Sequence, residues 1–114
     1  MFASTHLDAQ SGDTSRLLQA QKIVDILKQK TLPVILAGDF NAVVSTPLIT
    51  IFDNYFTRTC TTNCGFTVPV INHTRTIDFI VYGAQNKFTV TRHRVIAETY
   101  SSDHRPVMAV LQLQ

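Results

Sequence analysis

The sequence is 114 residues long, with 45% hydrophobic and 16% charged residues, which is ordinary for one globular domain and excludes an intrinsically disordered chain. The formal net charge of +2 falls short of the basic surface typical of nucleic-acid-binding proteins. No apolar run reaches the roughly 18 residues of a membrane span, and the first six residues lack the basic start and apolar stretch of a signal peptide. We therefore expect one domain over residues 1–114 with no membrane span, and the compartment, cytoplasmic or secreted, stays open.

Strand-like and helical segments alternate over the first half of the chain. Residues 2–7 (FASTHL) alternate like a short strand, and the polar segment 8–15 that follows is rich in helix-starting residues. From residue 16 to 30 the apolar side chains recur at helical spacing, which predicts an amphipathic helix. Residues 34–38 (VILAG) predict a buried strand. The dipeptide Thr46-Pro47 then predicts the N-cap and first residue of a short helix that ends near Asn54.

The second half is expected to hold a long surface loop and then three strands. Residues 57–76 are rich in Thr, Asn, Gly and Pro, which is typical of an irregular loop. Residues 76–83, 87–97 and 105–114 are rich in Val, Ile, Thr and aromatic residues, which predicts strands.

These strands carry apolar side chains on both of their faces. A sheet with two apolar faces needs a covering layer on each side, and the two predicted helices can cover only one. The sequence therefore predicts one half of a larger layered structure.

Cys60 and Cys64 are the two cysteines of the sequence. No second cysteine pair and no histidine at zinc-finger spacing accompanies them, so we do not expect a structural zinc site. Two free thiols and one local disulfide are both compatible with this spacing.

Polar residues stand at the ends of four predicted strands. In layered α/β folds, active sites form at strand ends and in the adjoining loops, because rigid strands aim side chains that remain accessible. Carboxylates can bind a hard cation such as Mg²⁺, a carboxamide can donate to an oxyanion, and an Asp–His pair can steady a phosphate. Such a set suits hydrolysis of a phosphate ester. Its members are His6, Asp39, Asn41, Asp78, Asp103 and His104.

Three motifs carry a resemblance to a known family. The segments GDFNA, TIDFI and SSDHRPV occur in this order, with STHLD upstream. Together they resemble the C-terminal half of the endonuclease/exonuclease/phosphatase superfamily, which has the pancreatic deoxyribonuclease-like fold. The resemblance implies an α/β fold that is half of a four-layered α/β/β/α sandwich, with one mostly antiparallel mixed sheet and helices on one face.

The resemblance also implies roles for the residues at the strand ends. Asp39 would orient or deprotonate the attacking water, and Asn41 would support this aspartate and the phosphoryl oxygens. His104 would contact the phosphate, with Asp78 as its orienting partner. Asp103 would bind the metal.

The remaining implied roles concern the leaving group and the substrate. His6 would act near the leaving group as a phosphate contact or an acid. Arg105 is the arginine that we expect to bind the substrate phosphate, because it follows the predicted phosphate ligand His104. The implied reaction is in-line attack of water on phosphorus with Mg²⁺ or Mn²⁺ as cofactor. A nucleic acid and a small phosphorylated molecule both stay open as the substrate.

The sequence departs from the family pattern in its length. Members of the superfamily are usually more than twice as long, and their N-terminal half supplies an asparagine and a metal-binding glutamate whose motifs this sequence lacks. We therefore expect the family domain to begin upstream of Met1. The alternative to a metal-dependent phosphoesterase is a catalytically incomplete fragment or a non-catalytic phosphate-binding domain. The open sheet face further predicts a homodimer, in which a second copy covers it.

Overall fold

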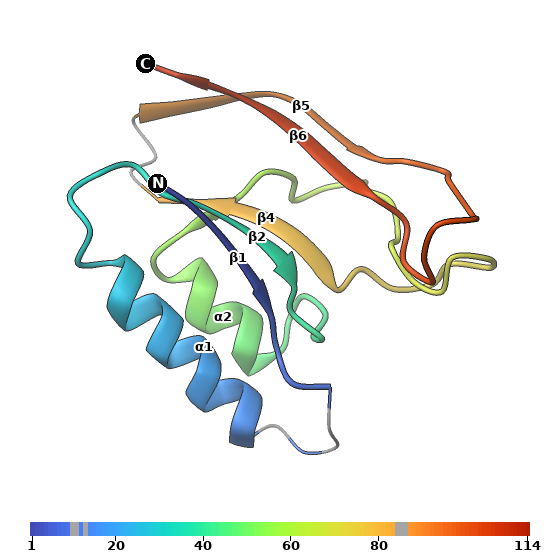
Figure 1. The fold of residues 1–114 in the computed structure, drawn as a ribbon, viewed down its shortest axis with the longest axis horizontal. Helices are drawn as coiled ribbons and strands as arrows, with labels where there is room; N and C mark the ends of the chain where they lie inside the picture. Colours follow the sequence, from blue (N-terminus) through green and yellow to red (C-terminus); the bar gives the residue numbers. More distant parts are fainter. Residues whose placement is uncertain (10–11, 13, 84–86) are drawn as a thin grey trace.

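A mixed four-stranded sheet lies between two helices and a pair of longer strands (Figure 1). The computed structural model describes residues 1–9, 12, 14–83 and 87–114. In chain order the elements are β1 (Phe2–His6), α1 (Thr14–Leu27), β2 (Ile35–Asp39), α2 (Pro47–Asp53), β3 (Thr57–Arg58), β4 (Asp78–Tyr82), β5 (Phe88–Val95) and β6 (Val107–Leu113).

The sheet has the strand order β1-β2-β4-β3. β1 and β2 run parallel, while β4 is antiparallel to both β2 and β3. Both helices pack on one face of this sheet (Figure 1). The prediction of an α/β fold with one mostly antiparallel mixed sheet and helices on one face is therefore confirmed.

The core lies between this sheet and the helices. The buried residues of α1 recur along one stripe of the helix, as the apolar spacing predicted. Burying one large apolar side chain stabilises the folded state by about 1.5–3 kcal/mol, so this layer is the main source of stability. Its largest fully buried apolar side chains are Leu7, Val24, Leu36, Phe40, Ile49, Phe52 and Val81.

β5 and β6 pair only with each other among the described strands and form a separate antiparallel sheet. They lie over the face of the four-stranded sheet that the helices leave open (Figure 1). The ring of Tyr82 in β4 meets the ring of Phe88 in β5 edge-on, with centroids 5.6 Å apart. The sequence predicted both strands and the need for a second cover, but not that these strands would supply part of it.

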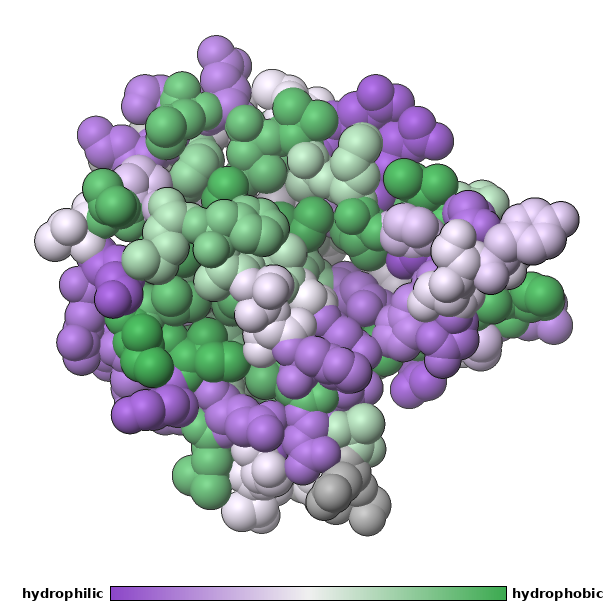
Figure 2. Space-filling view, in the orientation of Figure 1, coloured by the Kyte–Doolittle hydropathy of each residue, from purple (hydrophilic) through white to green (hydrophobic). Residues whose placement is uncertain are grey.

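The second cover does not extend over the whole sheet. At β1 the side chain of Phe2 stays 69% exposed, and in β6 Val110 and Leu113 are also exposed. Figure 2 shows apolar residues gathered on the face that carries β1 and β6. This open face is where the predicted further layer would lie.

Three local predictions need correction or limits. The predicted irregular loop 57–76 is partly ordered, because it contains β3 and an isolated bridge between Val68 and Arg75. α2 begins at Pro47 as predicted, but the Thr46 hydroxyl donates to the Val43 carbonyl at 2.7 Å and does not cap the helix. In the predicted polar segment 8–15, residues 10, 11 and 13 lie outside the described residues. No helix in the described part of the chain is long and apolar enough to cross a membrane.

Gly38 permits the close approach of β1 and β2. It stands opposite Thr5 in the parallel register, and a Cβ atom placed on it would lie 1.9 Å from the Thr5 carbonyl oxygen. The Thr5 carbonyl and the Gly38 Cα that would carry this Cβ belong to the backbones of paired strands, so the clash could be relieved only by shifting the strands. A glycine here therefore holds the register that places the ends of β1 and β2 side by side.

We expect Gly38→Ala to lower the free energy of unfolding by about 2–3 kcal/mol, because the added methyl group overpacks two paired backbones. Urea unfolding followed by circular dichroism measures this change. Ser4→Ala, at an exposed position of β1, is the control and should change stability by less than about 0.5 kcal/mol. A Gly38→Ala variant as stable as the control would contradict the role assigned to this glycine.

Candidate active site

The register of three strands places three of the predicted residues in one row. His6 of β1 pairs with Asp39 of β2, and Asp39 pairs with Asp78 of β4. Directly opposed residues have Cβ atoms about 4.5–5.5 Å apart, and like charges at this spacing destabilise a sheet. The two neighbouring carboxylates therefore need positive charge close to them.

His104 meets this need from the segment that precedes β6. Its Nδ1 lies 2.8 Å from Asp78 Oδ2, and its Nε2 lies 3.7 Å from Asp39 Oδ2. Burial alone lowers the pKa of His104, but the hydrogen bond and charge of Asp78, followed by the charges of Asp39 and Asp103, outweigh burial and raise that pKa above its ordinary value of 6.5. The folded chain thus favours an imidazolium beside both carboxylates.

His6 approaches Asp39 from the other side. Its Nε2 lies 3.4 Å from Asp39 Oδ2, and its side chain is 71% exposed, against 16% for Asp39. The carboxylate of Asp39 therefore lies between two imidazoles. His6 is much more exposed than Asp39, so it is the side chain of this pair that an incoming substrate would contact first.

Asn41 supports Asp39 through its backbone. Its N–H donates to Asp39 Oδ1 at 2.9 Å, and its side-chain amide donates to the Leu7 carbonyl at 2.6 Å. The residue has a φ of +48°, a left-handed conformation that asparagine tolerates better than most residues. The amide thus ties the chain after β1 to the loop after β2, while the predicted contact of Asn41 with phosphoryl oxygens stays a prediction.

The structure places Asp103 at the exposed rim of the candidate site and Arg105 partly inside the fold. The Asp103 side chain is 93% exposed, and its Oδ1 lies 3.9 Å from His104 Nε2. The Arg105 Nε donates to the Val70 carbonyl at 2.9 Å, and its backbone N–H donates to the Thr67 carbonyl at 2.8 Å. Arg105 therefore anchors the loop before β4 to the start of β6, and its contact with substrate stays a prediction.

A cavity of about 320 Å³ brings together four of the predicted residues, Asp39, Asp78, His104 and Arg105, whereas His6, Asn41 and Asp103 do not line it. Ligand atoms of Asp39, Asp78 and His104 lie within 4.8 Å of one another, close enough to hold a metal ion. Two carboxylates suit Mg²⁺ or Mn²⁺, because both ions prefer oxygen ligands. The donor set fits a divalent cation, with Asp103 farther out than its predicted role as metal ligand would suggest.

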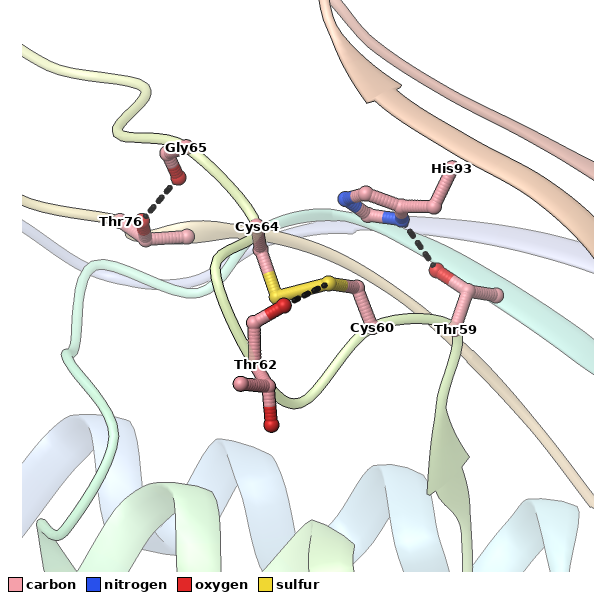
Figure 3. The surroundings of a disulfide bond; sticks show 7 residues. All are labelled: Thr59, Cys60, Thr62, Cys64, Gly65, Thr76 and His93. Atoms are coloured by element: carbon pink, nitrogen blue, oxygen red, sulfur yellow. Dashed lines mark hydrogen bonds between the residues drawn. A yellow bond between two sulfur atoms is a disulfide. The ribbon is translucent and has the colours of Figure 1, made fainter.

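The segment around the cysteines and His93 had no functional role predicted from the sequence. The structure joins Cys60 and Cys64 in a disulfide, which decides between the two alternatives left open (Figure 3). His93 of β5 shares a hydrogen bond with the Thr59 hydroxyl, at 2.8 Å from Nδ1. No motif marks these residues, and the threonine-rich composition of residues 57–76 was the available sign.

Comparison with known proteins yields one family and several solved structures. The family model described as "Endonuclease/Exonuclease/phosphatase family" matches residues 2–104. A conserved protein of unknown function from Enterococcus faecalis superposes with a TM-score of 0.81 at 21% identity, covering 97% of this chain and 49% of that one. No curated protein matches the sequence.

Two further solved structures carry a described activity or domain. A mannosyl-6-phosphatase from Bacteroides thetaiotaomicron has a TM-score of 0.75 and 25% identity over 96% of this chain and 50% of that one. The catalytic domain of human Nocturnin has a TM-score of 0.72 and 20% identity over 97% of this chain and 46% of that one. The chain spans about half the length of the solved structures that it matches.

In metal-free buffer, we expect the His104 imidazole to titrate above pH 6.5, and Asp78→Asn to lower its pKa by removing the charge of its nearest partner. Folding raises the pKa of His104, so the charged imidazole stabilises the folded chain. This contribution to the free energy of unfolding is complete below the unfolded-state pKa of about 6.5 and is lost as the pH rises through the folded-state pKa.

An NMR titration of the histidine Cε1–H signals measures this pKa in the native chain and in both variants. Asp103→Asn is the control, because its exposed carboxylate lies farther away at 3.9 Å and should have the smaller effect. Equal titration of His104 in the native chain and in Asp78→Asn would contradict the assigned pairing.

Proposed function

The chain belongs to the endonuclease/exonuclease/phosphatase family, and from this membership we propose that the protein hydrolyses phosphate esters, either diesters or monoesters. The observation that carries the proposal is the row of His6, Asp39 and Asp78, with His104 held against both carboxylates. Asp39 offers a base for water and His104 a cation for phosphate, and both line one small cavity.

Asp39 would activate the attacking water. Its Oδ1 is held by the Asn41 N–H, while its Oδ2 lies 3.4 and 3.7 Å from the Nε2 atoms of His6 and His104. These two distances exceed those of good hydrogen bonds, so Oδ2 keeps its capacity to accept a proton. Water would attack phosphorus as its proton passes to Oδ2, and the bond from phosphorus to the leaving oxygen would break in line, with inversion.

His104 would stabilise the charge that develops on the phosphoryl oxygens. With Nδ1–H donating to Asp78, the ring keeps one tautomer and turns Nε2 toward Asp39 and the cavity. The raised pKa of His104 favours a proton on Nε2, which can donate to a phosphoryl oxygen. His6 would donate a proton to the leaving oxygen, and Arg105 and Asn41 would add phosphate contacts.

A divalent cation, Mg²⁺ or Mn²⁺, is the proposed cofactor. Asp103 at the rim would hold it, as the resemblance implies, and Asp78 offers a second carboxylate, while Asp39 stays free to accept the proton of the attacking water. When bound, it would supply positive charge that neutralises the phosphoryl oxygens. The cavity, about 320 Å³ in volume, is large enough for a phosphoryl group, and a small phosphorylated molecule and a nucleic acid both stay open as the substrate.

We expect the chain to hydrolyse p-nitrophenyl phosphate or bis(p-nitrophenyl) phosphate with Mg²⁺ or Mn²⁺, and to lose this activity in EDTA. Asp39→Asn should lower kcat by about 100-fold or more, because it removes the proposed general base. Release of p-nitrophenol measures both effects.

Asp25→Asn, a charge change of the same kind on the exposed side of α1, is the matched control and should keep the native rate. Turnover by the native chain no faster than by Asp39→Asn would favour the alternative, a catalytically incomplete or phosphate-binding domain.

We also propose that this chain forms a homodimer through the open sheet face at β1. The proposal is supported by the exposed side chain of Phe2 and by the apolar residues gathered over β1 and β6 (Figure 2). A stable interface buries roughly 800 Å² per partner, and a second copy would remove these apolar groups from water.

Sedimentation velocity at micromolar concentration should give a dimer, and Phe2→Ser should shift the chain toward monomer. Ile71→Ser is the matched control, because Ile71 is similarly exposed, at 65% against 69%, but belongs to the loop between β3 and β4, away from β1 (Figure 1). A monomeric native chain would refute the dimer.

A further inference from the structure

A second cavity, of about 510 Å³, lies next to the active-site cavity. Its wall is formed by the disulfide loop (residues 60–64), by Val44 from the loop after β2, and by His93 from β5. Residues 78–80 of β4 belong to the walls of both cavities. The two cavities therefore adjoin along the first residues of β4, at the end of the sheet where the phosphate would lie against His104.

The wall of this second cavity is held in place by several links. The Cys60–Cys64 disulfide closes the loop, the Thr76 hydroxyl donates to the Gly65 carbonyl at 2.7 Å, and His93 is bonded to Thr59 (Figure 3). These links join the loop to the start of β4 and to β5. Together with a volume in the range of about 300–1,000 Å³ that small-molecule sites occupy, they describe a formed binding site.

The charged groups on this wall already have partners. Arg58 Nε lies 3.0 Å from Asp53 Oδ1, and Asp78 is bonded to His104. Burial lowers the pKa of His93, so its imidazole is neutral at pH 7. Because the charged side chains are paired, the hydroxyl, amide and aromatic groups make up the rest of the lining that a ligand can contact, and an uncharged ligand fits these groups best.

The remaining lining groups suit hydroxyl groups on that ligand. Thr61 and Asn63 offer a hydroxyl and a carboxamide, and the half-exposed ring of Phe66 offers a flat apolar surface. Figure 3 shows that the His93 nitrogen not bonded to Thr59 points toward the side of the disulfide loop. Sugar rings combine hydroxyl groups that hydrogen-bond with C–H faces that pack on aromatic rings.

We propose that this cavity binds the uncharged, hydroxyl-bearing part of the substrate, a sugar ring, while the phosphate ester lies at His104. Asn63 and Thr61 hydrogen-bond the sugar hydroxyls, and Phe66 packs against the ring. The proposal rests on the proposed phosphoesterase function and names the substrate class of that site.

The test compares kcat/KM for D-mannose 6-phosphate with kcat/KM for p-nitrophenyl phosphate, whose ring brings no hydroxyl groups. Thr61→Val keeps the shape of the side chain but removes the hydroxyl, and should lower the ratio of the two values about fivefold. Thr62→Val is the matched control, because Thr62 belongs to the same loop but its hydroxyl points away from His93 (Figure 3). The control should leave the ratio unchanged.

A ratio that falls no further in Thr61→Val than in Thr62→Val would overturn the sugar site while the phosphoesterase function stands. Circular dichroism verifies that each variant is folded. Asn63→Gly replaces Thr61→Val if that variant unfolds, because glycine adopts the left-handed backbone of Asn63, φ +52°, without strain.

If the native chain hydrolyses neither ester, the phosphoesterase proposal fails and the cavity is tested by itself. Methyl α-D-mannoside at millimolar concentration should then shift the ¹⁵N–¹H signals of Asn63 and Phe66 in the native chain. Unshifted signals would overturn the sugar site as well.

Discussion

The pairing of β2 between β1 and β4 is the constraint on which the site depends. It sets His6, Asp39 and Asp78 in one row, and it places two carboxylates directly beside each other. Neighbouring like charges cost free energy, so the fold needs a cation at this edge of the sheet. His104 provides it, and the same contacts that relieve the repulsion raise the pKa of His104 and fix the direction of its ring.

The two layers of strands contribute different parts of the site. The four-stranded sheet supplies the row of side chains, and the segment that leads into β6 supplies His104. The second layer is fastened by Arg105, which holds the Thr67 and Val70 carbonyls, and by the contact between His93 and Thr59. The packing of β5 and β6 on the sheet therefore shapes both the catalytic cavity and the neighbouring one.

Several residues have structural contacts that a motif does not reveal. Arg105 follows the predicted phosphate ligand in sequence, yet its Nε is bound to a loop carbonyl. The Asn41 side chain is bound to Leu7, 34 residues away, and Asp39 is supported by the backbone of Asn41. Leu7 and Val70 lie far from Asn41 and Arg105 in the sequence, so motifs could identify these two residues as candidates but could not separate a structural role from a catalytic one.

The sequence by itself determined the secondary structure elements other than β3, the family and the residue types at the strand ends, because periodicity, capping and short motifs are local properties of the chain. Only the tertiary structure decided that Asp39 and Asp78 are neighbours, that β5 and β6 form a separate layer, and that Cys60 and Cys64 are joined. It also decided that a cavity adjoins Asp78 and that Asp103 lies at the rim. Register, layering and cavities depend on contacts between residues far apart in the sequence, which local patterns do not encode.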